Sequence, residues 1–285
     1  MTQTQTRGVV LGGGGVTGIA WEIGVIAGLE RCGVDLRNAD LFVGTSAGAA
    51  VGAYLAYGDD VQALAAQQAD PAQQVHEQYR PYSQADADAR NRQLMEKVGG
   101  DLAAARRRIG AYAMRSTTPS QATRLDIIAA RLGRTRWPSR PLRLTAVDVA
   151  SGELRVFDAA SEVRFLDAVA ASCAVPGSWP AVAIEGRHYM DGGVHSITNA
   201  QVAQGMDRVI VLAPFGYSEQ NPVAGHLREE VANLRIQGAR VQVIEPDAAA
   251  LAAIGDNVLD PSRKPAALDA GVTMGERLAA ELSWW

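Results

Sequence analysis

Short apolar runs alternate with longer amphipathic stretches along most of the chain. A short apolar run predicts a buried strand, whereas apolar residues repeated every three or four positions predict a helix. Strands are predicted at residues 8–11, 41–43, 142–149, 153–157, 207–215 and 239–247. Helices are predicted at residues 19–31, 47–57, 226–237 and near 265–282. The strands at 142–149 and 153–157 are joined by a Ser151-Gly152 turn, which indicates a hairpin.

Residues 59–140 interrupt this alternation. The segment is rich in Gln, Asp, Ala and Arg, and prolines divide it into several amphipathic stretches that predict helices. Elsewhere, strands that alternate with helices indicate a mainly parallel sheet covered on both faces. We therefore expect an α/β protein in which 59–140 is inserted as a helical cap.

Composition and charge narrow the class of protein. The chain has 285 residues, of which 47% are hydrophobic and 20% charged, as in ordinary globular proteins. Its net charge of −4 gives no overall attraction to nucleic acid or to anionic lipid, so we expect no nucleic-acid partner. The only cysteines, Cys32 and Cys173, exclude a disulfide scaffold and suit a reducing compartment. With no signal-peptide pattern in the polar first residues, we expect a soluble, cytoplasmic protein.

A run of glycines follows the first predicted strand. Residues 12–18 read GGGGVTG, and Gly13, Gly15 and Gly18 satisfy the spacing of a dinucleotide-binding loop. Such a site also needs an acidic residue at the end of the next strand, to bind the ribose hydroxyls. Here Gly44 follows that strand, and Asp40 lies at its other end. The dinucleotide pattern is therefore incomplete, and an oxyanion-binding loop is the alternative.

The second predicted strand leads into the pattern G-x-S-x-G. Residues 44–48 read GTSAG, between an apolar strand and a helix rich in small residues. This is the setting of a nucleophile elbow, in which Gly44 and Gly48 permit the sharp turn that exposes Ser46. An activated serine also needs donors for the oxyanion. The bare backbone N–H groups of Gly13, Gly14 and Gly15, with that of Ala47, are the candidates.

The general base is less evident from single residues. The four histidines are His76, His188, His195 and His226, and only His226 has the chain order of a Ser-His-Asp hydrolase. His226 begins an amphipathic helix, where a solvated role is favoured. Asp191 is followed by Gly192 and Gly193, a turn that lets a carboxylate approach another backbone closely.

Other chemically suggestive residues have simpler interpretations. The spacing of His188, Asp191 and His195 matches no metal motif, so we expect no metal. We expect Arg106-Arg107-Arg108 to form a solvated helix face, and Cys173 to be a packed side chain. Trp179 and the final Trp284-Trp285 suggest transient contact with a membrane surface. For the last two tryptophans, docking on the domain and disorder are alternatives.

Together these residues form a recognisable pattern. The chain resembles the patatin-like phospholipase family in its glycine loop, the GTSAG elbow, the AASCAVPG block at 170–177 and the DGG at 191–193. The resemblance implies a single three-layer α/β/α domain over residues 1–285 and hydrolysis of acyl esters, usually of lipids, without a metal or cofactor. It also implies a dyad of Ser46 as nucleophile and Asp191 as general base. A carboxylate with an ordinary pKa of about 4 is a weak base, so such a site should rely on positioning and on its oxyanion hole.

Two positions depart from the family pattern. Thr17 replaces the usual Arg or Lys of the glycine loop, and Ala200 follows Asn199 where a proline is common. These departures leave open a silent family member that binds lipid or acts as a scaffold. A dinucleotide-binding oxidoreductase and an ordinary α/β-hydrolase with an essential histidine are two further alternatives.

Overall fold

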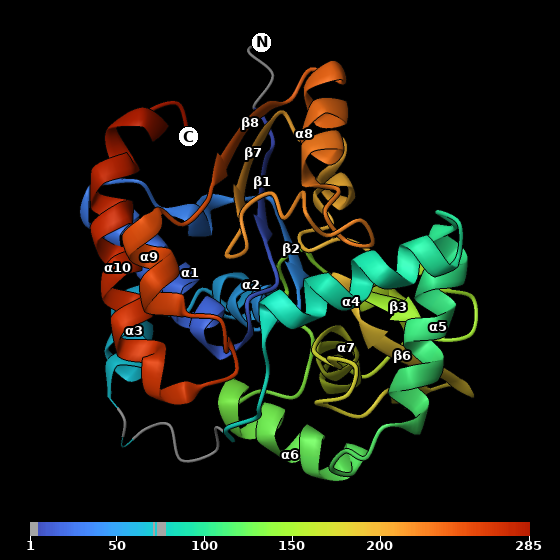
Figure 1. The fold of residues 1–285 in the computed structure, drawn as a ribbon. Helices are drawn as coiled ribbons and strands as arrows, with labels where there is room; N and C mark the ends of the chain where they lie inside the picture. The colour runs from blue at the N-terminus through green and yellow to red at the C-terminus, as the bar shows by residue number, and fades with distance from the viewer. Residues whose placement is uncertain (1–4, 71, 73–77) are drawn as a thin grey trace.

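A mixed sheet forms the centre of the molecule (Figure 1). The computed structural model describes residues 5–70, 72 and 78–285. The described strands are β1 (Arg7–Leu11), β2 (Leu41–Thr45), β3 (Leu142–Asp148), β4 (Leu154–Phe157), β5 (Val182–Ile184), β6 (Arg187–Asp191), β7 (Arg208–Leu212) and β8 (Arg240–Ile244). They are arranged in the order β5-β6-β3-β2-β1-β7-β8, with β4 paired to β3. The run from β3 to β8 is parallel, which confirms the predicted mainly parallel sheet, and the β3–β4 hairpin is antiparallel as predicted.

Helices cover both faces of this sheet. The described α-helices are α1 (Gly15–Arg31), α2 (Ala47–Tyr57), α3 (Val61–Ala69), α4 (Gln84–Lys97), α5 (Leu102–Arg115), α6 (Gln121–Leu132), α7 (Phe165–Ser172), α8 (Leu227–Ile236), α9 (Ala248–Ile254) and α10 (Lys264–Leu278). Successive side chains of β1 alternate between two cores. Val9 and Leu11 pack with α1, α2 and α10, whereas Val10 packs with α8. The result is a three-layer α/β/α fold.

Some elements escaped the sequence pattern. Helix α1 begins at Gly15, four residues before the predicted start, because its first turn consists of the bare residues of the glycine loop. Strands β5 and β6 and helices α7 and α9 were not predicted. Each is short, and β6 begins with two exposed residues, so the periodic signal that identifies a strand is weak there.

Helices α1 and α10 approach each other so closely that only glycine fits at the contact. A methyl group added at Gly24 would lie 2.3 Å from the carbonyl oxygen of Leu268, and one at Gly28 would lie 2.3 Å from that of Val272. The reverse contacts involve the glycines of α10: Gly271 against the Trp21 carbonyl and Gly275 against the Val25 carbonyl, at 2.4 and 2.2 Å. The C-terminal helix is therefore fixed against α1 by direct backbone contact.

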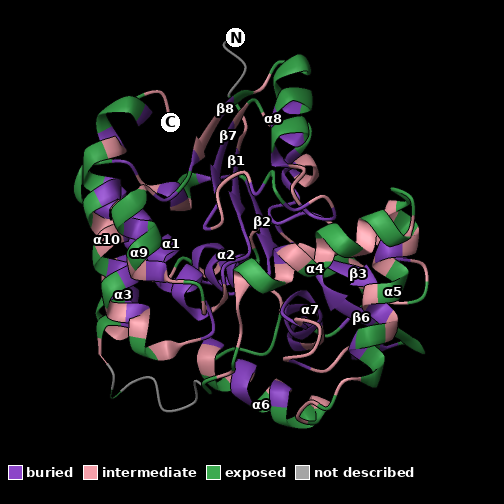
Figure 2. Cartoon of the chain, in the orientation of Figure 1, coloured by how far each residue is buried: buried purple, intermediate pink, exposed green. Residues whose placement is uncertain are grey.

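The helices between β2 and β3 differ in how they are attached. Within the predicted insertion of 59–140, α3 and α6 contribute buried side chains to the main core, among them Leu64 and Ile128. By contrast, α4 buries only Asp88, and α5 buries only small residues. Figure 2 shows both helices coloured mostly as intermediate and exposed. Among the described helices of this insertion, α4 and α5 thus bury no large apolar side chain in the core.

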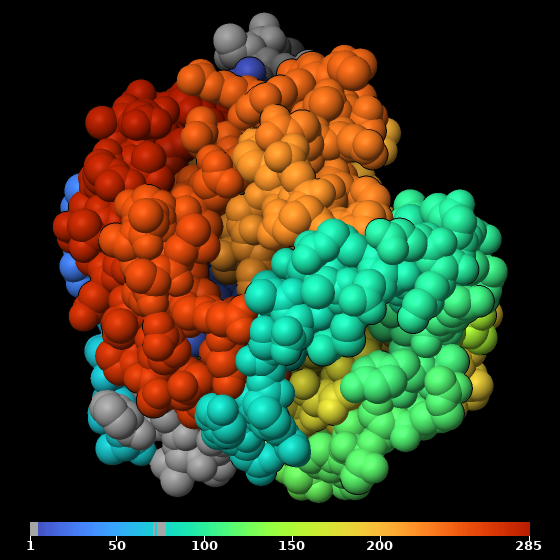
Figure 3. Space-filling view, in the orientation of Figure 1, coloured from blue at the N-terminus to red at the C-terminus, as the bar shows by residue number. Residues whose placement is uncertain are grey.

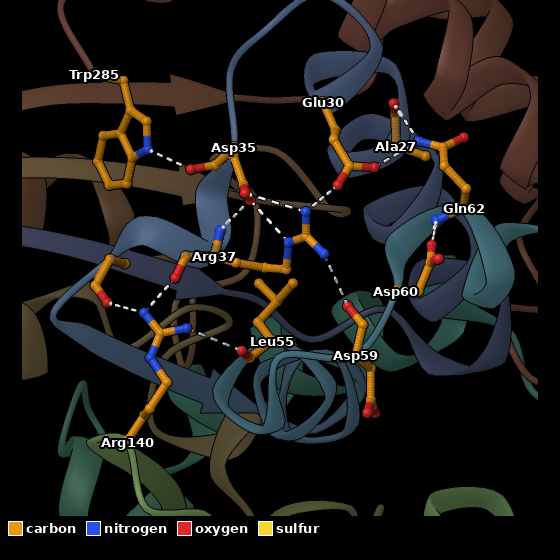
Figure 4. A network of polar contacts seen from close by, with 11 residues as sticks. Ala27, Glu30, Asp35, Arg37, Leu55, Asp59, Asp60, Gln62, Arg140 and Trp285 are labelled. Carbon is orange, nitrogen blue, oxygen red and sulfur yellow. Dashed lines mark hydrogen bonds and ion pairs between the residues drawn. The ribbon is translucent and has the colours of Figure 1, made fainter.

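The last two tryptophans dock on the domain. The Trp285 indole N–H donates to the Asp35 carbonyl at 3.2 Å, beside the ion pairs of Arg37 with Asp35 and Glu30 (Figure 4). Arg208 donates to the Trp284 carbonyl. Of the alternatives for this tail, docking is the one observed.

The close approach of α1 and α10 gives a stability prediction. Gly28→Ala should lower the free energy of unfolding by about 3 kcal/mol, because the added methyl meets the backbone of α10 rather than a movable side chain. Gly52→Ala in α2 is the matched control, because its methyl would meet only the ends of the Leu142 and Leu11 side chains, at 3.2 and 3.3 Å. Urea unfolding of the two variants measures the difference, and equal effects would contradict a backbone contact.

Candidate active site

Ser46 lies in a strained turn between β2 and α2. Its φ of 54° and ψ of −114° are unusual for a residue with a side chain. Gly44 and Gly48 make the turn possible: a methyl at Gly48 would lie 2.0 Å from the Leu11 carbonyl oxygen, and one at Gly44 would lie 2.6 Å from that of Gly48. Backbone strain of this kind persists where the surroundings fix it, and it is typical of a nucleophile elbow.

The end of α7 fixes both Ser46 and Asp191. The Ser46 N–H donates to the Ser172 hydroxyl at 2.9 Å, and the Cys173 thiol donates to the Ser46 carbonyl at 3.1 Å. One residue later, the Ala174 carbonyl accepts the Asp191 N–H at 3.0 Å. The AASCAVPG block therefore holds the backbone of both residues. The sequence pattern indicates this block but predicts no role for Ser172 and only a packing role for Cys173.

Asp191 is a buried carboxyl, and one of its oxygens has no hydrogen-bond partner among the described residues. It ends β6 and is only 5% exposed, and its Oδ1 accepts the Gly193 N–H at 2.8 Å. Its Oδ2 accepts no hydrogen bond of ordinary geometry from the described residues. Burial raises the pKa of Asp191 to about 6, against lowering by the Gly193 N–H, by the nearby Ser46 hydroxyl and by the charge of Arg124. The Ser46 hydroxyl thus lies close enough to the Asp191 carboxyl to lower its pKa.

The turn after Asp191 packs tightly against β3. A methyl at Gly192 would lie 2.4 Å from Thr145 Oγ1, and one at Gly193 would lie 3.0 Å from Asp191 Oδ1. Gly192 is therefore required by its contact with β3, whereas a methyl at Gly193 would crowd the Asp191 carboxyl.

The glycine loop offers fewer donors than the sequence predicts. The Gly13 N–H already donates to the Ile197 carbonyl at 2.8 Å, which argues against Gly13 as an oxyanion donor. Gly14 caps α1 and Gly15 begins it, so their N–H groups have no acceptor within the helix. Ala47 begins α2 and is in the same situation. The candidate donors are therefore Gly14, Gly15 and Ala47.

Thr17 does not supply the cation that the family pattern places there. It is wholly buried, and its N–H and hydroxyl both point to the Val258 carbonyl, at 3.2 and 3.5 Å. The cation that acts on Asp191 comes instead from α6: Arg124 is 4% exposed, and its guanidinium lies 3.8 Å from the centre of the Trp179 ring. Arg124 also borders a small space of about 30 Å³ beside Ser46 and Ala47. Nothing in the local sequence pointed to this residue.

A buried amide joins the elements that carry the site. The Asn199 side chain donates to Thr45 Oγ1 and to the Gly192 carbonyl, both at 3.1 Å, and to the Ser196 carbonyl at 2.8 Å. Asn199 itself adopts a left-handed conformation with φ of 51°. The sequence pattern predicts no role for Asn199, which enters only as the residue before Ala200. Its contacts fix the loop after Asp191 against the strand that leads to Ser46.

Two of the described histidines bond to groups other than the candidate nucleophile. His195 bonds through Nδ1 to Asn199 Oδ1 at 2.9 Å, and the ring of His226 bonds to the Val223 carbonyl at 3.0 Å. Burial, helped by Arg106, lowers the pKa of His195 to about 4. His188 lies exposed on β6, and His76 is outside the described residues. Among the described residues that line the cavity at Ser46, none is a histidine.

The structure also locates the arginine run and Trp179, for which the sequence predicts a solvated face and membrane contact. Arg106 turns inward to the His195 carbonyl, at 2.8 Å, so only Arg107 and Arg108 belong to the predicted solvated face. Trp179 is 5% exposed, which contradicts its predicted contact with a membrane surface. Within the described part of the chain, no cluster of three or more His, Cys, Asp or Glu side chains is placed to hold a metal ion. None of the described helices is both long and apolar enough to cross a bilayer.

A cavity of about 950 Å³ opens at Ser46 and Asp191. Gly14 and Gly15 lie at its inner end, and α4 and α5 form its outer wall. Tyr82 lines it as well, and burial together with the charge of Asp191 raises the pKa of this phenol. The volume suits a sizeable organic ligand, with convergent polar groups at one end.

The model of the patatin-like phospholipase family matches residues 9–203. The chain belongs to this family. The matched range begins in β1 and includes the elbow, the AASCAVPG block and the loop of Asp191. Family membership supports a lipase- or phospholipase-type hydrolase. No curated protein matches the chain.

Two solved structures are similar to this patatin-like chain. VipD from Legionella pneumophila is 13% identical with a TM-score of 0.46, over 97% of this chain and 67% of VipD. The type III effector protein ExoU is 17% identical with a TM-score of 0.43, over 98% of this chain and 53% of ExoU. The chain thus spans about two thirds of the length of the first and about half of the second.

The burial of Asp191 gives a prediction about stability and pH. Its folded pKa of about 6 exceeds the ordinary 3.8, so the folded state binds more protons and loses stability as the pH rises from about 4 to about 6. Asp191→Asn cannot ionise and should be more stable than wild type at pH 8, by up to about 3 kcal/mol. At pH 4 the two should unfold alike. Urea unfolding at both pH values measures this.

Asp207→Asn is the control with the opposite sign, because hydrogen bonds from Thr6 lower the pKa of Asp207. This variant should be less stable than wild type at pH 8. Equal stability of Asp191→Asn and wild type at pH 8 would contradict a desolvated carboxyl.

Proposed function

We propose that this protein is a serine acyl hydrolase that cleaves lipid esters with Ser46 and Asp191. The observation that carries the proposal is the meeting of a strained elbow serine with a buried carboxyl whose Oδ2 has no partner among the described residues. The family supports the same class of reaction.

The first half of the reaction forms an acyl-enzyme. Asp191 Oδ2 takes the hydroxyl proton of Ser46 as Ser46 Oγ attacks the ester carbonyl carbon. The carbonyl oxygen becomes an oxyanion, which accepts hydrogen bonds from the N–H groups of Gly14, Gly15 and Ala47. As the ester C–O bond breaks, Asp191 returns its proton to the leaving alcohol, and the acyl group stays on Ser46.

The second half releases the acid. Asp191 takes a proton from water, which attacks the acyl carbon, and the proton then passes to Ser46 Oγ as the acyl bond breaks. The raised pKa improves Asp191 as a base, because a general base is most effective when its pKa lies near the working pH. Burial thus makes Asp191 a stronger base than a carboxylate with the ordinary pKa.

Among the described residues, two of the alternatives lack the groups they need. An ordinary α/β-hydrolase needs a histidine at the serine, whereas His195 and His226 bond elsewhere. A dinucleotide site needs an acidic residue at the end of β2, where Thr45 and Ser46 lie. A silent, lipid-binding family member has the same fold and is separated from the proposal by experiment.

Labelling with a fluorophosphonate, followed by intact mass, tests the nucleophile. Wild type should gain one adduct, and Ser46→Ala should gain none. Asp191→Asn should react at least about 10²-fold more slowly, because proton transfer to a positioned base contributes that much. His226→Ala is the matched control and should react as wild type does. Folded wild type without an adduct would refute the hydrolase and favour the silent alternative.

The pH profile tests the base. With a soluble ester, kcat/KM should rise with pH through an apparent pKa of about 6, as Asp191 loses its proton, and then level off. Arg124→Gln should move this limb to higher pH, because Arg124 lowers the pKa of Asp191. Arg124→Lys keeps the charge and should leave the limb near that of wild type.

Arg80→Gln is the control for stacking, since Arg80 also lies over the Trp179 ring, at 4.8 Å, without acting on Asp191. If Arg80→Gln moved the limb as far as Arg124→Gln does, a structural effect on Trp179 would replace the electrostatic one.

A further inference from the structure

The charge of the chain is divided unevenly. Residues 84–115, which span α4 and α5, contain seven basic and four acidic residues, whereas the rest contains twenty basic and twenty-seven acidic ones. One basic residue of this segment, Arg106, is directed inward. The excess of positive charge is therefore local, in a chain with a net charge of −4.

Three of the four positive residues of α5, Arg107, Arg108 and Arg115, are exposed. Arg108, Tyr112 and Arg115 follow at four- and three-residue spacing, so they form one stripe along the helix. Arg107 and Met114, seven residues apart, form a second stripe beside it. All five side chains are exposed. Figure 3 shows α4 and α5, in teal to green, standing out on this face of the molecule.

Exposed apolar side chains gather in the same place. Of the five large hydrophobic residues that are exposed in the described chain, Tyr79, Tyr112 and Met114 belong to this region, with 61%, 55% and 48% of their surface exposed. The other two are Ile236 on α8 and Leu251 on α9. Tyr79 and Tyr112 also line the cavity at Ser46, so two of these three exposed apolar residues belong to its lining.

We define the cap face by six exposed residues of α4 and α5: Lys97, Arg107, Arg108, Tyr112, Met114 and Arg115. Within the described part of the chain, no ion pair joins its cations to an acidic side chain. Their charge is therefore available to a partner.

We propose that the cap face binds the surface of an anionic lipid bilayer and turns the cavity mouth toward it. The choice of partner rests on the proposed function, since the cavity would then receive an ester directly from the membrane. Cations alone would suit a nucleic-acid backbone equally well. Tyrosine and methionine among the cations suit a bilayer better, because such side chains enter the boundary between head groups and acyl chains.

Vesicle binding of the Ser46→Ala protein tests this without consuming lipid. It should cosediment with vesicles that contain phosphatidylglycerol at least about tenfold more tightly than with phosphatidylcholine vesicles, since each surface cation adds severalfold. High salt should abolish the preference, because the screening length falls from about 8 Å at 0.15 M to about 3 Å at 1 M.

Two matched variants in the same background locate the surface. Arg107→Gln/Met114→Ser/Arg115→Gln removes two cations and one exposed apolar residue of the cap face, none of which lines the cavity. It should weaken binding about tenfold. Arg136→Gln/Arg155→Gln/Ile236→Ser removes two exposed cations and the 83% exposed Ile236 from other elements, and should bind as before.

Equal loss in both variants, equal binding to both kinds of vesicle, or tighter binding to duplex DNA than to the anionic vesicles would overturn the proposal. Circular dichroism of each variant establishes that it is folded. Vesicle binding without fluorophosphonate labelling would refute the hydrolase and leave the cap face standing. Labelling of wild type without vesicle binding of Ser46→Ala would refute the cap face alone.

Discussion

One backbone contact brings the two halves of the candidate site together. Gly48, in the first turn of α2, lies so close to the end of β1 that a methyl group there would be 2.0 Å from the Leu11 carbonyl oxygen, and its N–H donates to the Gly12 carbonyl at 3.0 Å. The turn that carries Ser46 is thereby packed directly on the turn that carries Gly14. Because both turns end neighbouring parallel strands, the register of β1 and β2 sets the distance between Ser46 and the N–H groups of Gly14 and Gly15. A larger residue at position 48 would separate them.

Two features of the candidate site are energetically unfavourable, and contacts from other elements stabilise both. Ser46 has a strained backbone, and Asp191 is a carboxyl with little solvent around it. Neither state would persist in isolation. The end of α7 bonds to both, and Asn199 joins the loop of Asp191 to β2. The stability lost at the site is thus offset by polar contacts from elements that take no part in the chemistry.

Features that depend on consecutive residues were predictable from the sequence, whereas features that depend on residues remote in the chain were not. The elbow was predicted because strand, glycines, serine and helix are consecutive, and α2 has the predicted bounds of 47–57. The occupied N–H of Gly13 was not predictable, because its acceptor, Ile197, is remote in the chain. The same holds for Arg124, whose neighbours Trp179 and Asp191 belong to other elements. The raised pKa of Asp191 follows from burial, which a single DGG turn does not reveal.

The helices that are least constrained by core packing, α4 and α5, also line the cavity at Ser46. Helices α1 and α10 admit only glycine at their contact, and the elbow admits only glycine at positions 44 and 48. Helix α4 buries a single side chain, so most of its positions accept substitutions without loss of core packing. Yet α4 and α5 form the outer wall of the cavity. The chemistry of the site is therefore fixed by the sheet and its turns, whereas the access of a substrate to Ser46 is set by two helices that the core hardly constrains.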